Sequence, residues 1–255
     1  MKLIRFGKQG EEKPGILLSN DEKIDVSSFV SDYDEKFFES GGLVNLKDWL
    51  NENESSAPRL DDSIRLGSPI ARPSKIICIG LNFKDHAAES GFDAPEEPLI
   101  FGKATSAICG PYDNIIIPRG SEQTDWEVEL GVVIGKKTSY VDQDQALDHV
   151  GGYVLHNDVS ERAFQKDRGG QWIKGKSADT FAPMGPFMAT PDEIDNISDM
   201  RMWLNVNGEN MQDGNTSNLI FSVDHVVSYL SQFMTLLPGD VISTCLLYTS
   251  PSPRD

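Results

Sequence analysis

The stretch Thr124–Ile134 constrains this chain most, because it places two carboxylates at the entrance to a very apolar segment. The run Leu130–Ile134 is typical of a buried strand, and residues two apart in a strand project from the same face. Glu127 and Glu129 would therefore point together and repel each other where hydration is poor. A hard cation such as Mg²⁺ or Mn²⁺ would relieve that repulsion, since both take carboxylate oxygens. The alternative is an exposed edge strand with alternating glutamates.

A third acidic side chain, Asp158, ends a second apolar strand, at the point where the chain leaves Tyr153–Leu155. Strand ends that gather acidic groups are common places for sites built on rigid elements. Asp158 is therefore a third candidate metal ligand. In the alternative interpretation it caps a helix that begins at Val159.

Composition and charge exclude several classes of protein. The 255 residues carry 40 acidic and 23 basic side chains, for a formal net charge of −17, and such a surface repels nucleic acids and anionic membranes. The sequence has no apolar run of about 18 residues, and its first residues, Met1–Phe6, are typical of a charged strand rather than a signal peptide. We therefore expect a cytoplasmic protein without nucleic-acid or membrane partners. The three cysteines lack a CxxC spacing, so they predict neither a disulfide framework nor a zinc site.

The chain divides into two parts of different character. Short apolar segments broken by turn formers predict a small β-rich domain over residues 1–72, and a buried strand at Ile76–Gly80 opens a core that we place at residues 73–244. Many short strands with few helices favour a β-rich α+β fold over a doubly wound sheet. Asn207-Gly208 predicts a hairpin. Val223, Val226, Val227, Leu230 and Phe233 fall at helical spacing and predict an amphipathic helix with a core-facing stripe.

These motifs together resemble the fumarylacetoacetate hydrolase family, in the order in which the family carries them. The agreement begins with Glu127-Val128-Glu129 followed by Asp158, which is similar to the family's metal triad. The other segments that carry the resemblance are Ile79–Glu89, Pro98–Lys103, Gly151–Tyr153, Lys174–Ser177, Leu204–Glu209 and Leu237–Thr244. The residues before Pro73 are similar to the small domain of bacterial members that act on 2,4-diketo-3-deoxy sugar acids or on ureidoglycolate.

The resemblance implies a fold and a set of site residues. It implies a mixed β-roll or barrel core, a homodimer, and Mg²⁺ or Mn²⁺ held by Glu127, Glu129 and Asp158. It further implies the following roles: His86 and Glu89 as a dyad that activates water, Lys176 as a third catalytic residue, and Gln165, Lys103 and Asn82 as substrate contacts. The spacing of the dyad agrees, because residues three apart on a helix are neighbours. For Lys103 the alternative is a structural ion pair.

The activity that the resemblance implies is hydrolysis of a carbon–carbon bond in a small 2,4-diketo acid. The metal would anchor the carboxylate and the 2-keto oxygen, the dyad would deprotonate water, and cleavage would leave an enolate that the metal stabilises. The same site would serve an oxaloacetate decarboxylase, a keto–enol isomerase or a ureidoglycolate lyase. A metal-binding protein without catalysis is the alternative of another class.

The sequence departs from the family pattern near its end. Residues 245–255 resemble the translation of a sequencing adapter, so we expect a gene that is truncated at its 3′ end. We expect the chain as written to fold poorly or to have little activity, and the intact parent gene to encode an active enzyme. The family's next loop, which supplies a threonine and backbone amides to the substrate carboxylate, would be missing. Phe83 stands where the family commonly carries Tyr, and Leu81 stands where some relatives carry Arg, which argues against a simple acylpyruvase.

Overall fold

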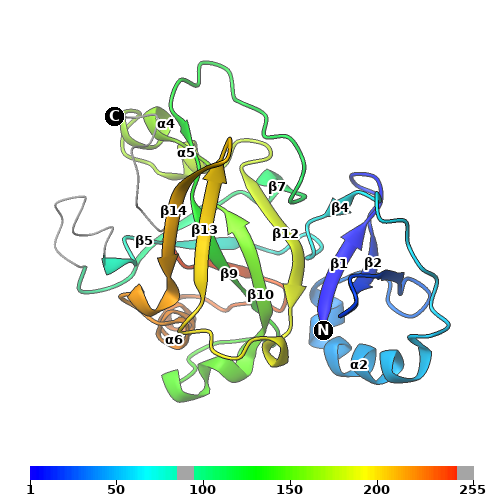
Figure 1. Cartoon of the computed structure of the whole chain (residues 1–255). Coiled ribbons are helices and arrows are strands. Elements are labelled where there is room, and N and C mark those ends of the chain that lie inside the picture. Colours follow the sequence, from blue (N-terminus) through cyan, green and yellow to red (C-terminus); the bar gives the residue numbers. More distant parts are fainter. Residues whose placement is uncertain (85–94, 246–255) are drawn as a thin grey trace.

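The computed structural model describes residues 1–84 and 95–245, and it is a mixed α+β structure dominated by one large sheet (Figure 1). The strands are β1 (Lys2–Phe6), β2 (Lys13–Leu17), β3 (Lys23–Asp25), β4 (Leu66–Gly67), β5 (Ile76–Gly80), β6 (Leu99–Lys103), β7 (Ile108–Cys109), β8 (Thr124–Asp125), β9 (Val128–Ile134), β10 (Val150–Asn157), β11 (Ser160–Glu161), β12 (Ala182–Ala189), β13 (Arg201–Val206), β14 (Glu209–Asn215) and β15 (Val241–Ser243). The α-helices are α1 (Glu35–Glu39), α2 (Gly42–Asn53), α4 (Arg162–Lys166), α5 (Ile173–Lys176) and α6 (Val223–Phe233). Short 3₁₀ helices cover Thr105–Ala107, Gln143–His149, Pro191–Glu193 and Thr216–Asn218. The predicted β-rich α+β fold is confirmed.

The sheet has eleven strands and joins the N-terminal part of the chain to the core. Its order is β3-β2-β1-β12-β10-β9-β15-β5-β6, with β4 added on β1 and β7 on β12. The junction is the antiparallel pairing of β1 with β12, where Lys2 lies opposite Ala189. Figure 1 shows β1, β2 and α2 to one side of the core strands β9, β10 and β12. The division between residues 72 and 73 stays a prediction.

Strand β9 lies at the centre of the sheet and separates two hydrophobic clusters. All seven of its residues are buried. Leu130, Val132 and Ile134 pack into a cluster with α6, whereas Val133 packs into the cluster that includes Val154 of β10. Because strand side chains alternate between faces, Glu129 and Gly131 lie on the same face as Val133. Burial on both faces explains why this strand is apolar nearly throughout.

The predicted hairpin and the predicted amphipathic helix both form. Strands β13 and β14 form the hairpin, and its turn residues Asn207 and Gly208 have φ values of 52° and 87°, as a turn of this kind requires. Helix α6 buries Val223, Val226, Val227 and Leu230 as predicted. Phe233 was wrongly placed in that stripe: it is 61% exposed and packs its ring on Tyr229, 4.9 Å away.

The described residues also show the state of a buried cysteine and bear on the expectation of no membrane partner. Cys78 is buried in β5, and burial raises the pKa of its thiol, so it stays protonated and unreactive. In the part of the chain that the structure describes, no helix combines the length and the apolarity needed to cross a membrane.

Candidate metal centre

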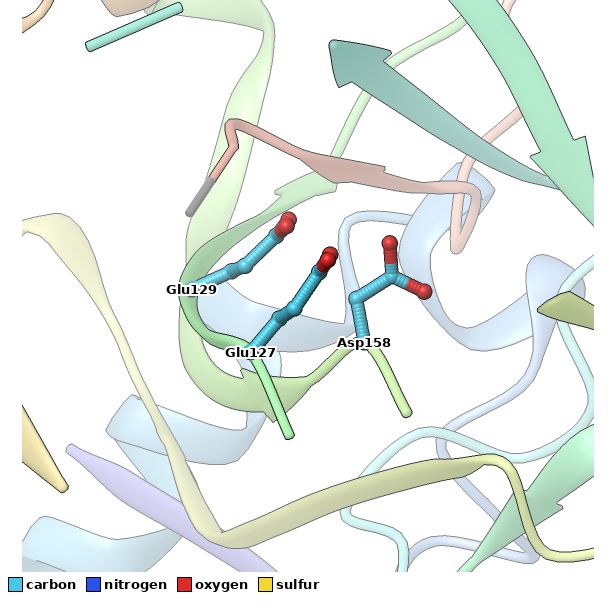
Figure 2. Close-up of side chains that lie close together, drawn as sticks. All are labelled: Glu127, Glu129 and Asp158. Carbon is cyan, nitrogen blue, oxygen red and sulfur yellow. The ribbon is translucent and has the colours of Figure 1, made fainter. Parts of the chain in front are cut away.

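Three buried carboxylates from two neighbouring strands meet at one point (Figure 2). Glu127 directly precedes β9, Glu129 lies within it, and Asp158 directly follows β10. Each side chain offers one oxygen, and these oxygens all lie within 4.8 Å of one another. The backbone extends the pairing of the two strands to this point, because Asp158 N donates to Glu127 O over 2.8 Å. The structure therefore brings together the three residues that the sequence singled out as metal ligands.

Glu129 has less positive charge close to it than the other two carboxylates of the triad, which both form ion pairs. Burial, reinforced by the charges of Asp158 and Glu127, raises the pKa of Glu129 well above its ordinary value. A hard divalent cation fits the donor set, because Mg²⁺ and Mn²⁺ prefer carboxylate oxygens and would offset the mutual repulsion. The buried position of all three side chains, at 5%, 1% and 0% exposure, keeps such an ion from full hydration.

Two buried lysines already compensate part of the negative charge. Lys176 Nζ donates to Glu127 Oε2 over 2.7 Å and to Asp158 Oδ2 over 2.5 Å. Lys103 Nζ donates to Asp158 Oδ1 and, over 3.0 Å, to Val159 O. Burial alone would raise the pKa of Asp158, but the two ammonium groups outweigh burial and lower it. Burial likewise opposes the charge of Lys176, yet Asp158 and Glu127 raise its pKa.

Lys103 and Lys176, both predicted site residues, form ion pairs with carboxylates of the triad. Lys103 forms the ion pair that was the alternative to substrate binding, and its contact with substrate stays a prediction. Lys176, at the end of α5, lies within reach of both carboxylates and of the Phe101 ring, whose centroid is 5.0 Å from Nζ. Asp158 does not cap a helix at Val159, because α4 begins at Arg162 and is capped by Glu161.

Sequence analysis missed a third buried cation, Arg162. Its Nε and Nη2 donate to Asp125 Oδ2 over 2.9 and 2.7 Å, and Nη2 also forms an ion pair with Glu127 Oε1. Its Nη1 donates to Gln165 Oε1 over 3.0 Å, which places the predicted substrate contact Gln165 beside the triad. Asp125 is buried too, and its spacing of two residues from Glu127 was the available signal.

A second missed feature supports Glu129 from the opposite side. Ser243 Oγ donates to Glu129 Oε2 and lies 2.6 Å from His156 Nδ1. His156 is buried, and burial lowers its pKa to about 3. The ring is therefore neutral at physiological pH.

The other predicted site residues lie at the edge of the centre or outside the described chain. Asn82 is fully buried, and its side chain bonds the backbone of Phe221 and Thr244, so it fixes the loop before α6 against the end of β15. A substrate contact by Asn82 stays a prediction. His86 and Glu89 belong to residues 85–94, which lie outside the described residues, as do residues 246–255 of the predicted adapter-derived tail.

A cavity of about 410 Å³ opens next to the centre. Its walls come from β6 and from the segment that leads into α5, and they are Leu99, Ile100, Phe101, Gly102, Gly170, Gln171, Trp172 and Ile173. The triad does not line it. Phe101 connects the two, because its ring packs on Lys176 as well as lining the cavity.

This fold and this triad define a member of the fumarylacetoacetate hydrolase family, to which the chain belongs: residues 75–245 match the family described as fumarylacetoacetate (FAA) hydrolase C-terminal. A protein of Burkholderia ambifaria that is named as a hydrolase is 50% identical over 244 residues, which cover 96% of this chain and 86% of that protein. The fumarylacetoacetate hydrolase of Exiguobacterium antarcticum superimposes with a TM-score of 0.82 at 32% identity, over 96% of this chain and 86% of its own.

Two further solved structures of this fold carry different activities in their names. The maleylpyruvate hydrolase of Sphingobium sp. SYK-6, solved with manganese(II) and pyruvate, has a TM-score of 0.82 at 25% identity and covers 98% of this chain and 90% of its own. The 5-carboxymethyl-2-hydroxymuconate delta-isomerase of Mycobacterium smegmatis has a TM-score of 0.75 at 32% identity and covers 96% and 87%. The family thus includes both hydrolases and isomerases.

Proposed function

We propose that this chain is a divalent-metal-dependent hydrolase that cleaves a carbon–carbon bond in a small 2,4-diketo acid. The observation that carries the proposal is the convergence of Glu127, Glu129 and Asp158, whose oxygens lie within 4.8 Å of one another beside Lys176. Mg²⁺ or Mn²⁺, when bound there, supplies a Lewis acid that anchors and polarises the carboxylate and 2-keto oxygens of the substrate.

The chain's own residues would supply the remaining functions. Lys176 has three donors and uses two of them on Glu127 and Asp158, so the third can meet an oxygen that gains negative charge during the reaction. Arg162 holds Glu127 from the other side and orients Gln165. We assign proton removal from water to His86 with Glu89, a role taken from the family resemblance.

The cavity beside Phe101, whose exposed walls are about as polar as they are apolar, would accept a substrate with a compact, weakly polar tail. Trp172 and Phe101 pack edge to face, with ring centroids 5.1 Å apart, and form one of its walls. A diketo acid would place its charged end at the triad and its variable end in this cavity.

A second candidate reaction is keto–enol isomerisation, because a structural neighbour at 32% identity is named as an isomerase. Oxaloacetate decarboxylation and ureidoglycolate cleavage use the same kind of anchor and stay alternatives, as does metal binding without catalysis. Homodimerisation and a cytoplasmic location remain predictions, the first testable by light scattering coupled to gel filtration.

The test is an assay of 2,4-diketo acids with Mg²⁺ or Mn²⁺, in which loss of substrate absorbance and release of pyruvate are followed separately. Hydrolysis gives both signals, whereas isomerisation changes absorbance without releasing pyruvate. The matched control is Glu209→Gln at the exposed start of β14 in the β13–β14 hairpin, which should leave turnover unchanged. Full activity in EDTA would overturn the metal-dependent mechanism.

A further inference from the structure

His156, Ser243 and Glu129 lie on one face of three adjacent strands. The sheet order places β9 between β10 and β15. His156 is the cross-strand partner of Glu129, and Ser243 is the partner of Gly131. The three side chains share the face of Val133, Val154 and Val241, which pack together in one cluster.

The contact between Ser243 and His156 has to cross the middle strand. Strands two apart in a sheet are separated by about 9–10 Å, yet Ser243 Oγ lies 2.6 Å from His156 Nδ1. Gly131 makes this possible, because it leaves open the space that a side chain on this face of β9 would occupy. A Cβ atom there would lie 2.6 Å from Val154 Cγ1 and 3.7 Å from His156 Cβ.

The chemistry of the groups determines which atom donates in the hydrogen bonds between His156, Ser243 and Glu129. A metal-ligating Glu129 is ionised and can only accept, so the single hydroxyl proton of Ser243 goes to Glu129 Oε2. Ser243 Oγ must then accept from His156, which therefore carries its proton on Nδ1. Both hydrogen bonds that Glu129 receives from described residues, from Ser243 Oγ and from Cys245 N over 3.1 Å, reach Oε2, so Oε1 is left for a cation.

The other ring nitrogen supports the same assignment. Among residues 1–84 and 95–245, His156 Nε2 is the one buried side-chain nitrogen or oxygen without a hydrogen-bond partner. A leucine or phenylalanine would fill this position without leaving a polar atom unpaired. The hydrogen bond that the imidazole makes is therefore the one from Nδ1 to Ser243 Oγ.

We infer that His156 and Ser243 are positioning residues, which hold the Glu129 carboxylate so that Oε1 faces the bound divalent cation of the proposed function. Groups that orient a metal ligand in this way typically change metal affinity by about 10–100-fold when removed.

The experiment measures Mn²⁺ affinity by electron paramagnetic resonance in the full chain and in four variants. We expect His156→Leu and Ser243→Ala to raise the Mn²⁺ Kd by about 10–100-fold, and His156→Asn to restore most of it, because its amide can place an N–H near the position of Nδ1. The control is His149→Leu, which breaks a similar contact, 3.0 Å to Thr138 Oγ1, at the opposite end of β10. It should leave the Mn²⁺ Kd unchanged.

A readout on the metal-free protein separates positioning from a merely structural role. His156→Leu should retain or raise the thermal midpoint while it weakens Mn²⁺ binding, whereas a structural histidine would lower the midpoint and leave the affinity unchanged. Nitrogen-15 NMR of the wild-type ring in the Mg²⁺-loaded chain, which needs no variant to fold, should show the proton on Nδ1.

The outcomes distinguish this inference from the proposed function on which it rests. Unchanged Mn²⁺ affinity in both His156→Leu and Ser243→Ala, or a ring proton on Nε2, overturns the positioning role and leaves the metal site intact. Absence of Mn²⁺ binding by the wild-type chain overturns the metal site itself and the inference with it.

Discussion

At the scale of single residues, both carboxylate oxygens of Glu127 contact a buried cation. Its Oε1 pairs with Arg162, and its Oε2 lies 2.7 Å from Lys176, while it also offers an oxygen toward Glu129 and Asp158. Replacement by the neutral isostere glutamine would keep the shape and remove the charge. The effect on metal binding and the effect on the surrounding cations can therefore be measured on the same variant.

We predict that Glu127→Gln weakens Mn²⁺ binding by more than about 100-fold, because loss of a group that only orients a ligand already costs about 10–100-fold. The measurement is a titration followed by electron paramagnetic resonance. Glu209→Gln, on the exposed hairpin, serves as the control for the loss of one negative charge. An unchanged Mn²⁺ Kd in Glu127→Gln would show that the cation is held elsewhere.

Arg162 provides a second prediction, about stability. Arg162→Met leaves Asp125 and Glu127 buried without their guanidinium partner, so we expect a loss of about 3–5 kcal/mol in the free energy of unfolding, measured by urea denaturation. Arg201→Met is the matched control, because it breaks an arginine–aspartate pair that also uses Nε and Nη2 but whose side chains are 65% and 39% exposed. It should leave stability nearly unchanged. Equal losses in the two variants would contradict the argument from burial.

The residue pattern could predict the carboxylates of this site, and the family resemblance named its two lysines, but neither singled out Arg162 or Ser243. Glu127 and Glu129 are marked by their spacing at a strand entrance, and Asp158 by its place after an apolar strand. Arg162 finds its partner Asp125 from 37 positions away, and Ser243 reaches Glu129 across 114. Such contacts depend on strand order and register, which local pattern does not determine.

At the scale of elements, hydrophobic periodicity predicted the buried strands β5 and β9 and helix α6, and it failed at the end of that helix. The helical stripe of α6 is buried from Val223 to Leu230, but the next position in phase, Phe233, is the last residue of the helix and lies in solvent. Residues 35–53 form two helices and not one, because the chain turns at Gly41, with φ at +72°, between α1 and α2. Periodicity predicts a face, while the end of an element depends on its tertiary neighbours.

This difference along α6 gives the third prediction. Leu230→Ala should reduce the free energy of unfolding by about 2–5 kcal/mol, since Leu230 is fully buried between α6 and β9. Phe233→Ala, three residues further on the same helix, should change it by less than about 1 kcal/mol, because the ring is 61% exposed and contributes mainly its contact with Tyr229. Urea denaturation of both variants is the measurement. A larger loss in Phe233→Ala would mean that the end of the helix is covered in solution.

At the scale of the whole molecule, the net charge of −17 means that divalent cations will collect on the surface as well as in the centre. A simple rise in stability with added metal is therefore weak evidence for a specific site. Specific binding has two further marks: it saturates at low concentration, and it depends on the triad.

We predict that Mn²⁺ at 100 times its Kd raises the free energy of unfolding by about 2.7 kcal/mol, because the folded chain binds the ion and the unfolded chain has no assembled triad. For a domain of this size the rise corresponds to about 5–10 °C in the thermal midpoint, measured by calorimetry at constant ionic strength, and EDTA should reverse it. Glu127→Gln should lose the saturating part of the shift and keep only the weak dependence on cations that the acidic surface gives. If Glu127→Gln were stabilised by Mn²⁺ as strongly as the wild-type chain, the ion would be binding to the general negative surface, and the triad would be a buried ionic cluster balanced by its own lysines and arginine.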